Sequence, residues 1–323
     1  MSEWTDALWY TAPGEAEIRR TSLPPLGPGM VEIETAASLI SRGTERLVWQ
    51  GNVPLGERDR MRAPLQEGDF PFPVKYGYAA AGTIVAGDDA RLGQRVFCLA
   101  PHQRRLRVPS TMALTIPEDV PLGRAVLAAN LETALNAVWD ASPQPGAKVL
   151  VIGLGLVGLL VTLTLTRQRD LSVATHDVLL ERRESALQIS VKFLKENEIR
   201  PEFDTVFHTS ASPGGLATAL SACRFEGTVI ELSWYGDRMI EVPLGAAFHS
   251  QRLTLKSSQV GHVAPSRRAS TTLSGRLSKA LALASDPRLD ALVTEEIAFD
   301  DAPATLSRLL APGAPGIATR LSY

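Results

Sequence analysis

Residues 148–166 read KVLVIGLGLVGLLVTLTLT, and their pattern indicates the fold class. Its first part is rich in β-branched residues and predicts a short buried strand, whereas its leucine-rich second part predicts a helix. Between them, Gly153, Gly155 and Gly158 form a GxGxxG pattern. A strand before this pattern and a helix after it are typical of a dinucleotide-binding fold.

Each glycine has a separate predicted role. Gly153 permits the tight turn, Gly155 lets the backbone approach a pyrophosphate, and Gly158 lets the helix pack closely on the strand. Leu156 and Val157 begin the helix, whose N-terminus favours the negative charge of the pyrophosphate. We therefore expect these five positions to contact the cofactor.

The same run carries no charge from Val149 to Thr166, which is long enough to span a membrane. The glycines divide it into a strand, a turn and a helix start, as suits a parallel sheet covered on both faces. We therefore predict no association with a membrane.

An acidic residue follows at the spacing expected for a ribose contact. Asp177 lies nineteen residues after Gly158, at the end of the next predicted strand. A carboxylate there accepts the ribose hydroxyls of NAD and repels the additional phosphate of NADP. Arg182 and Arg183 follow closely in the sequence. They are either solvated charges on a helix or partners for the 2′-phosphate of NADP. The sequence predicts NAD and leaves NADP as an alternative.

Composition excludes several other classes of function. The 323 residues suffice for two domains, and 33 basic against 35 acidic side chains give a net charge of −2. This balance predicts no binding to nucleic acid. Cys98 and Cys223 are too few for a disulfide framework, and the N-terminus shows no signal-peptide pattern, so we expect a cytoplasmic protein.

The predicted elements change character along the chain. Up to residue 121, short alternating apolar runs separated by Pro and Gly predict β-strands. Strands and helices then alternate up to residue 273, which predicts an α/β fold with a doubly wound parallel sheet. The helices expected in and near this part are residues 123–141, 180–196, 215–223 and 274–285.

This order of features resembles the medium-chain dehydrogenase/reductase superfamily. The resemblance implies a GroES-like β-rich domain, residues 1–121 and 274–323, and a Rossmann domain, residues 122–273. Locally, ISRGTERLVWQG is similar to the branch of bacteriochlorophyllide-type secondary alcohol dehydrogenases. The landmarks are LPPLGPGMVEIE (23–34), ISRGTE (40–45), KYGYAAAGTIV (75–85), GQRV (93–96) and FDDAPATLSRLLAPG (299–313).

The chain departs from this family at the positions that hold its catalytic zinc. Such a site needs about three Cys, His or carboxylate ligands. The four-cysteine structural zinc lobe is missing as well, so we expect no bound zinc. We expect nearby Glu132 to be a hydrogen-bonded helix residue. The residues at the ligand positions are Ser41 or Arg42, Tyr78 with Ala79, and Ala129 or Asn130.

Without zinc, a side chain must stabilise the developing alkoxide during hydride transfer. The resemblance places Tyr78 at the cleft between the domains, where its phenol either donates a proton or packs under the nicotinamide. Ser41 and Thr44 are candidates to hold the substrate oxygen, oriented by Glu45. His102 is a second candidate acid, because imidazole titrates near neutrality, or else a surface residue.

The resemblance also places further residues along the cofactor. We expect Ser210, Ser233, Trp234 and Ser258 to contact it, although Trp234 is equally compatible with a role in the core. His208 ends a Rossmann strand and would lie near the adenosine half.

These features predict a zinc-independent oxidoreductase that transfers a hydride between NAD(H) and a small secondary alcohol or ketone. One alternative is an NADPH-dependent quinone or enoyl reductase, and another is a non-catalytic dinucleotide-binding protein. The resemblance implies a homodimer in which Rossmann sheets join edge to edge, and residues 250–263 supply the expected edge strand.

Overall fold

The computed structural model describes residues 3–189 and 191–323. It divides into two compact units, one containing residues up to Ala129 together with Leu281–Tyr323, the other Asn130–Ala280. The domain boundaries expected from the sequence, at 121/122 and 273/274, lie somewhat earlier in the chain than the boundaries of these two units. One reason is that helix α2 (Leu122–Ala125) contacts strands of the first unit, β3 and β6.

The first unit is built around strand β3, Met30–Ile40. Its alternating sequence places Val31 and Ile33 in an apolar core with side chains from neighbouring strands. β3 pairs antiparallel with three strands, and the sheet order is β16-β17-β3-β6-β7-β9, with β8 also paired to β3. The strands are β6 (Ala80–Ala86), β7 (Arg95–Cys98), β8 (Arg105–Pro109), β9 (Leu114–Thr115), β16 (Val293–Ala298) and β17 (Ala318–Ser322).

A second sheet in this unit contains an N-terminal hairpin that we did not predict. Strands β1 (Trp4–Ala12) and β2 (Glu15–Ser22) pair antiparallel. The sheet order is β2-β1-β5-β4, where β5 is Val74–Lys75 and β4 is Glu67–Gly68. The hairpin supplies Tyr10, which belongs to the site described below.

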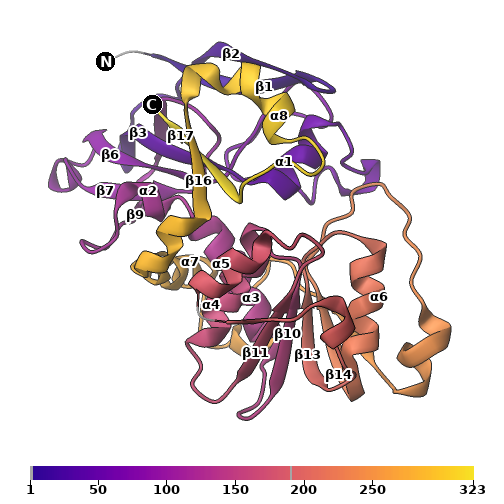
Figure 1. Ribbon diagram of the computed structural model, residues 1–323. Coiled ribbons are helices and arrows are strands. Elements are labelled where there is room, and N and C mark those ends of the chain that lie inside the picture. The colour runs from indigo at the N-terminus through magenta and orange to yellow at the C-terminus, as the bar shows by residue number, and fades with distance from the viewer. Residues whose placement is uncertain (1–2, 190) are drawn as a thin grey trace. The chain divides into compact units, whose positions relative to one another are not determined.

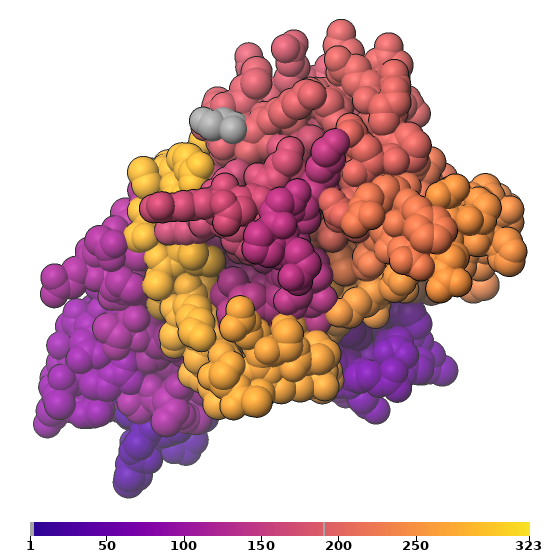
Figure 2. Space-filling view, turned by 90° about the horizontal axis from the view of Figure 1, so that it is seen from below, coloured from indigo at the N-terminus to yellow at the C-terminus, as the bar shows by residue number. Residues whose placement is uncertain are grey.

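The end of the chain returns to this unit. β17 pairs antiparallel with β3, and β16 runs parallel to β17. Helix α8 (Ala302–Leu309) connects the two C-terminal strands. In Figure 2 the C-terminal segment, in yellow, lies against purple residues from the N-terminal part of the same unit.

The second unit confirms the predicted parallel sheet, whose strand order is β12-β11-β10-β13-β14-β15. All of its pairs are parallel, and helix α4 (Leu156–Thr166) packs on β10 and β11 while α6 (Pro213–Ala222) packs on β13 and β14 (Figure 1). The strands are β10 (Lys148–Ile152), β11 (Ser172–His176), β12 (Lys192–Phe193), β13 (Phe203–His208), β14 (Cys223–Glu231) and β15 (Thr254–Ser257).

The central strand of this sheet is buried on both faces. Residues 149–152 of β10 are all buried, as expected for a strand covered by helices. Leu150 and Ile152 pack with Leu216 and Leu220 of α6 and with Val229 of β14. This core fixes the strand ends from which the cofactor candidates project.

Two predicted helices differ from the structure. The helix expected at 180–196 is only α5 (Arg182–Gln188), because Val191 and Leu194 are buried on either side of the short strand β12. Position 190 of that prediction lies outside the described residues. The helix expected at 123–141 is divided into α2 and α3 (Ala128–Ala141). Among the described residues, no helix has the length and apolar character to cross a membrane.

Candidate functional site

The glycine loop between β10 and α4 has two positions that only glycine fits. Gly153 has φ +94°, and an added Cβ would lie 2.7 Å from the backbone nitrogen of Ser210. A Cβ on Gly158 would lie 1.8 Å from the carbonyl oxygen of Gly153. By contrast, a Cβ on the exposed Gly155 would meet nothing within 4 Å. The backbone at the start of the helix is therefore accessible, as contact with a pyrophosphate requires.

Asp177 follows β11 and is bonded to this loop. Its Oδ2 accepts a hydrogen bond from the Leu154 amide at 2.6 Å, and its Oδ1 accepts one from the Leu179 amide at 2.8 Å. Each carboxylate oxygen can accept a further hydrogen bond. The carboxylate is therefore fixed beside the glycine loop and retains acceptor capacity for ribose hydroxyls.

Leu156 and Val157 form the half-buried first turn of α4. Of the two nearby arginines, Arg182 is half-buried and Arg183 is exposed, at the start of α5. The loop and Asp177 thus fit a dinucleotide, and the arginines keep the NADP alternative open.

The other cofactor candidates lie in the loops that follow β13, β14 and β15. Ser210 is exposed and lies beside Gly153, and the Ser233 hydroxyl accepts a hydrogen bond from the Ala211 amide at 3.0 Å. Trp234 is half-buried. The Ser258 hydroxyl donates to Asp140 at the end of α3, at 2.7 Å.

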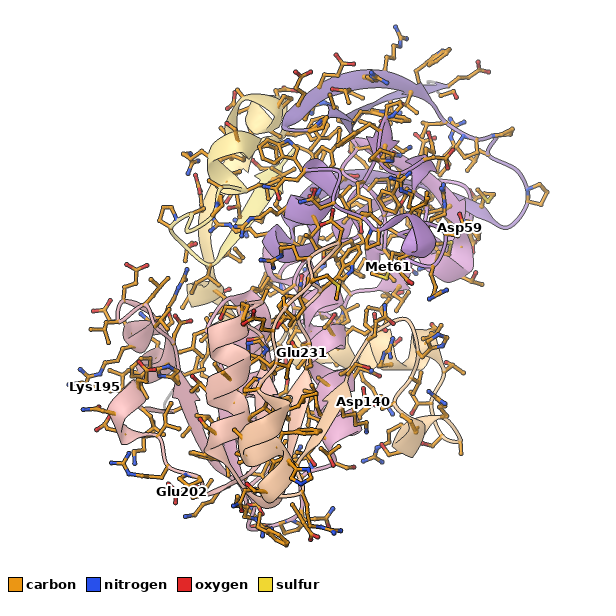
Figure 3. All side chains as sticks on the ribbon, turned by 90° about the vertical axis from the view of Figure 1, so that its right-hand side faces the viewer. Asp59, Met61, Asp140, Lys195, Glu202 and Glu231 are labelled. Atoms are coloured by element: carbon orange, nitrogen blue, oxygen red, sulfur yellow. The ribbon has the colours of Figure 1, made fainter. Side chains whose placement is uncertain are left out.

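These loops lie at the carboxyl edge of the sheet, where doubly wound folds bind ligands. Figure 3 labels Glu231 at the end of β14 and Glu202, which precedes β13, at the opposite end of the sheet.

In the first unit, the backbone at Gly77, just before Tyr78, packs closely against the ring of His102. Gly77 has φ +115°, and an added Cβ would lie 2.8 Å from ring atoms of His102. The hydroxyl of the mostly buried Tyr78 is hydrogen-bonded to the side chains of Ser41 and Thr44. Burial raises the pKa of Tyr78 to about 12, against the opposing effect of these two bonds. Tyr78 is therefore a protonated phenol near neutral pH.

Helix α1 (Arg42–Trp49) positions the partners of Tyr78. Ser41 is its N-cap residue, and the Ser41 amide donates to Oε1 of Glu45 at 2.6 Å. This bond satisfies one of the amides that a helix N-terminus leaves unpaired. Glu45 thereby fixes the turn that carries both Ser41 and Thr44.

A buried hydrogen-bonded pair lies behind this turn. Oε2 of Glu45 is 3.1 Å from Nε2 of His102 and accepts a hydrogen bond from the Tyr10 hydroxyl at 2.6 Å. Burial raises the pKa of Glu45, but His102, Tyr10 and the Ser41 amide lower it, and the net direction is downward. Glu45 is therefore a carboxylate.

His102 lies inside the fold rather than at its surface. Its side chain is 0% exposed, and its Nδ1 is 2.7 Å from the hydroxyl of Ser38. The Ser38 hydroxyl is in turn 2.8 Å from that of Tyr323. Sequence analysis did not predict Tyr10, Ser38 or Tyr323 here, because all three are far from His102 in the sequence and belong to no motif.

The residues at the expected zinc positions do not fit a zinc site. Ser41 caps α1, Arg42 donates to the carbonyl oxygen of Pro315 at 2.5 Å, and Ala79 is buried. Within residues 3–189 and 191–323, no three His, Cys, Asp or Glu side chains gather to hold a metal. The pair Glu45 and His102 falls short of the three ligands that catalytic zinc needs.

Glu132 is paired with an arginine, and both cysteines are buried. Oε1 of Glu132 accepts a hydrogen bond from the buried Arg276 at 2.9 Å. Burial raises the pKa of both Cys98 and Cys223 to about 12, so neither is a thiolate near neutral pH.

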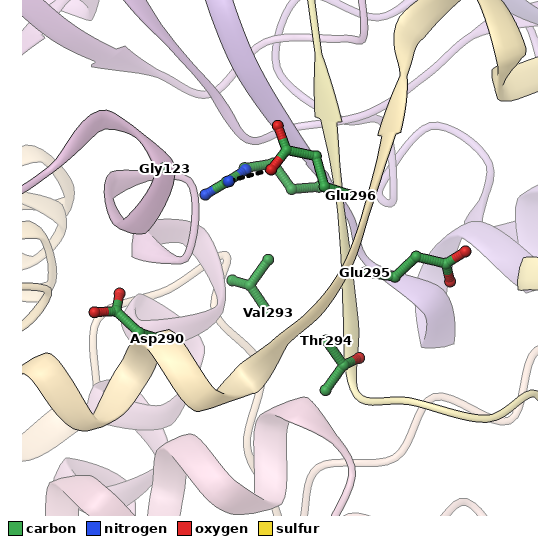
Figure 4. Close-up of a pocket in the computed structure, with 7 residues that line it drawn as sticks. Gly123, Asp290, Val293, Thr294, Glu295 and Glu296 are labelled. Carbon is green, nitrogen blue, oxygen red and sulfur yellow. Dashed lines mark hydrogen bonds and ion pairs between the residues drawn. The ribbon is translucent and has the colours of Figure 1, made fainter.

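A hollow in the first unit involves none of the predicted site residues (Figure 4). Its charged groups are paired, Arg320 with Glu296, Asp290 with Arg124 and Glu295 with Arg308. We therefore do not assign a ligand to it.

The comparisons with known proteins agree with this fold. No family model matches the chain. Over 257 residues it is 26% identical to the 2-desacetyl-2-hydroxyethyl bacteriochlorophyllide A dehydrogenase of Cereibacter sphaeroides, covering 72% of this chain and 74% of that protein. It is 22% identical over 221 residues to an uncharacterized zinc-type alcohol dehydrogenase-like protein of Haemophilus influenzae, covering 64% of this chain and 60% of the relative.

Two solved structures share the fold over the whole chain. The alcohol dehydrogenase RspB of Escherichia coli CFT073, in complex with NADH, has a TM-score of 0.76 at 16% identity, with 100% of both chains covered. A chain of Sinorhizobium meliloti described as a zinc-binding dehydrogenase and solved with NADP has a TM-score of 0.79 at 16% identity, again over 100% of both chains. At this identity the likeness shows the fold alone.

The chain therefore has the fold of these dehydrogenase structures. The relatives and structural neighbours confirm the predicted resemblance to the medium-chain dehydrogenase/reductase superfamily, and they support the predicted NAD(P)-dependent oxidoreductase.

Proposed function

We propose that the chain is a zinc-independent oxidoreductase that transfers a hydride between NAD(H) and a small secondary alcohol or ketone. The observation that carries this proposal is the 2.6 Å hydrogen bond between the Asp177 carboxylate and the Leu154 amide of the glycine loop. It fixes an anionic acceptor beside the backbone that would hold the pyrophosphate.

The cofactor would be held by groups that the second unit already presents. Gly153, Gly155 and the first turn of α4 would contact the pyrophosphate, and Asp177 would accept the ribose hydroxyls. When bound, the nicotinamide supplies or accepts the hydride. Because Asp177 is anionic, a 2′-phosphate in the same position would be repelled, which favours NAD.

Tyr78 is the proposed group that stabilises the substrate oxygen. Its hydroxyl is hydrogen-bonded to the side chains of Ser41 and Thr44, and these bonds lower its pKa against the larger effect of burial. The Tyr78 proton would be donated to a substrate carbonyl, where it would stabilise the developing alkoxide. A phenol with a pKa of about 12 stays protonated near neutral pH, so its proposed role is that of the acid in ketone reduction.

A second candidate is an NADPH-dependent quinone or enoyl reductase. Arg182 and Arg183 favour it, because guanidinium groups at the start of α5 follow Asp177 closely and suit a 2′-phosphate. The hydroxyls around Tyr78 would stabilise an enolate as well as an alkoxide.

Turnover assays separate the candidates. Chelator-treated protein is supplied with NADH or NADPH and with panels of ketones, quinones and enones, and consumption of the reduced dinucleotide is followed. We expect NADH-dependent turnover of a ketone. NADPH-dependent turnover of a quinone or enone alone would establish the second candidate, and binding without turnover of any panel would favour a non-catalytic dinucleotide-binding protein.

We further propose a cytoplasmic homodimer. Within the described part of the second unit, β15 is the terminal strand of the sheet, and its Leu255 is 36% exposed. An edge strand of this kind can pair with a second copy. A cytoplasmic location is supported by the two cysteines, which are both free thiols.

A further inference from the structure

A cluster at the carboxyl edge of the second unit contains a titratable pair that hydride transfer does not require. His208 ends β13 and is 0% exposed, and Glu231 ends the adjacent strand β14. Nδ1 of His208 lies 2.7 Å from Oε2 of Glu231, and Nε2 lies 2.6 Å from the hydroxyl of Ser210. The buried imidazole therefore links a carboxylate to an exposed serine.

The chemistry of the partners fixes the direction of these bonds. A carboxylate only accepts, so Nδ1 of His208 must donate its proton to Glu231. In the neutral imidazole the other nitrogen, Nε2, is then an acceptor. With a neutral His208, the Ser210 hydroxyl donates its proton inward, to Nε2 of His208.

A neighbouring serine completes the hydrogen bonding of Ser210. The Ser212 hydroxyl accepts from the Gly215 amide at 3.0 Å and lies 3.0 Å from the Ser210 hydroxyl. Because the proton of Ser210 goes to His208, Ser212 donates to Ser210. The exposed Ser210 oxygen then has one remaining lone pair, and it can only accept a further hydrogen bond.

The Glu231 carboxylate also connects the loop that carries Ser210 with the loop that follows β14. Oε1 of Glu231 accepts from the Ser233 amide at 2.7 Å, and the Ser233 hydroxyl accepts from the Ala211 amide at 3.0 Å. Ser210 also adjoins the glycine loop, because a Cβ on Gly153 would lie 2.9 Å from the Ser210 Cβ. The network thus holds two of the predicted cofactor contacts next to the glycine loop.

We propose that the buried His208 and its partner Glu231 are positioning residues that present the Ser210 hydroxyl oxygen as an acceptor for a hydroxyl or amino donor of the bound dinucleotide. This inference rests on the proposed function, because it assumes that a dinucleotide occupies the carboxyl edge of this sheet. Ser210 is the contact, and His208 and Glu231 act through it.

The test measures dinucleotide affinity in a double-mutant cycle. NADH is titrated into the wild type, Ser210→Ala, His208→Asn and the double variant, with binding followed by fluorescence and calorimetry. Asn at position 208 can still donate to Glu231 but leaves Ser210 without its acceptor. We expect each single variant to bind NADH about threefold to tenfold more weakly, and the double variant to be no weaker than Ser210→Ala.

Two matched controls test whether such substitutions weaken NADH binding through a general loss of structure. His249 is exposed, so His249→Asn makes the same substitution away from the network. Glu226→Gln alters an exposed residue of β14 that pairs with Arg252, whereas Glu231→Gln alters the network from the same strand. We expect both controls to bind NADH like the wild type and Glu231→Gln to resemble His208→Asn.

A second measurement requires no ligand. Nitrogen-15 NMR of the histidine rings of the wild type reports which ring nitrogen carries the proton, with His208 assigned from its loss in His208→Asn. We expect the proton on Nδ1. A proton on Nε2 would overturn the proposal, as would wild-type affinity in Ser210→Ala or additive losses in the double variant. Failure of the wild type to bind either dinucleotide would overturn the proposed function together with this inference, whereas unchanged affinity in the variants would overturn only the inference.

Discussion

Glu45 and His102 form a buried pair whose Oε2 and Nε2 atoms are 3.1 Å apart, and both side chains are 0% exposed. The pair lies directly behind the turn that carries Ser41 and Thr44, and through them it supports Tyr78. Its removal should therefore affect both stability and the geometry around Tyr78.

Replacing Glu45 by Gln should destabilise the protein. Gln removes the charged acceptor of the bonds from His102, Tyr10 and the Ser41 amide, and a hydrogen bond to a charged group contributes about 1.5–3 kcal/mol. Urea unfolding at neutral pH measures the loss. Glu57→Gln is the matched control, because Glu57 pairs with Arg60 at the surface and should cost at most about 1 kcal/mol.

The effect of Glu45 should also depend on pH. Its folded-state pKa is lowered, so its stabilising contribution is present above the ordinary carboxyl pKa of about 4.3 and is lost as pH falls through the folded-state pKa. Unfolding free energies of the wild type and Glu45→Gln should therefore converge in acid. A constant difference between them from neutral pH into acid would contradict this assignment.

Replacing Tyr78 by Phe should lower turnover by about 10² to 10⁴-fold, because the ring stays and only the donor is lost. Dinucleotide affinity should be unchanged, since the aromatic ring is kept and only the hydroxyl is removed. With a pKa of about 12, Tyr78 should add no ionisation to the pH profile near neutrality. Steady-state kinetics and an NADH titration check both points, and unchanged turnover would reduce Tyr78 to a packing residue.

How far the sequence predicts this molecule differs between its two units. In the second unit the glycine motif, the apolar strand before it and Asp177 are local signals, so both the parallel sheet and the glycine-loop candidates could be predicted. In the first unit the contacts among Tyr10, Glu45 and His102 join segments far apart in the chain. No periodicity or spacing encodes single contacts of that kind.

The same distinction between local signals and long-range contacts explains why some expected elements differ from the observed helices and strands. Residues 180–196 contain enough helix-forming residues to predict one helix, yet burial of Val191 and Leu194 favours a turn and the short strand β12. From the sequence, His102 is expected to be either an acid or a surface residue, and the surface position is the one that the structure contradicts. Its burial is set by Gly77 and Glu45, which contact it only in the folded chain.

Zinc should be absent from the active protein. Protein purified without added metal should contain well below one zinc per chain by elemental analysis, because the described residues do not provide three suitable ligands. Treatment with a chelator should leave turnover unchanged. Stoichiometric zinc that is lost together with activity would refute zinc independence.

The dimer prediction is tested at the sheet edge. Light scattering should give a mass near twice 34.8 kDa. Leu255→Lys places a charge on edge strand β15 and should yield a monomer. Leu244→Lys is the control, because Leu244 is 50% exposed and lies outside that strand. A wild-type monomer at micromolar concentration would contradict the prediction.

The choice between NAD and NADP is decided at Asp177. Asp177→Ala should weaken NADH binding by roughly 1–3 kcal/mol, the value of hydrogen bonds to a charged group. Binding of NADPH should weaken less or improve, because the repulsion of its 2′-phosphate is removed. Equal losses for the two dinucleotides would show that Asp177 supports the loop without selecting the cofactor.

Zinc-independent use of NAD(H), on which the proposed function rests, is checked by titrating chelator-treated wild-type protein with NADH and with NADPH. We expect saturable binding of one NADH per chain, with a dissociation constant lower than that for NADPH. Tighter binding of NADPH, or no binding of either dinucleotide until zinc is added, would contradict it.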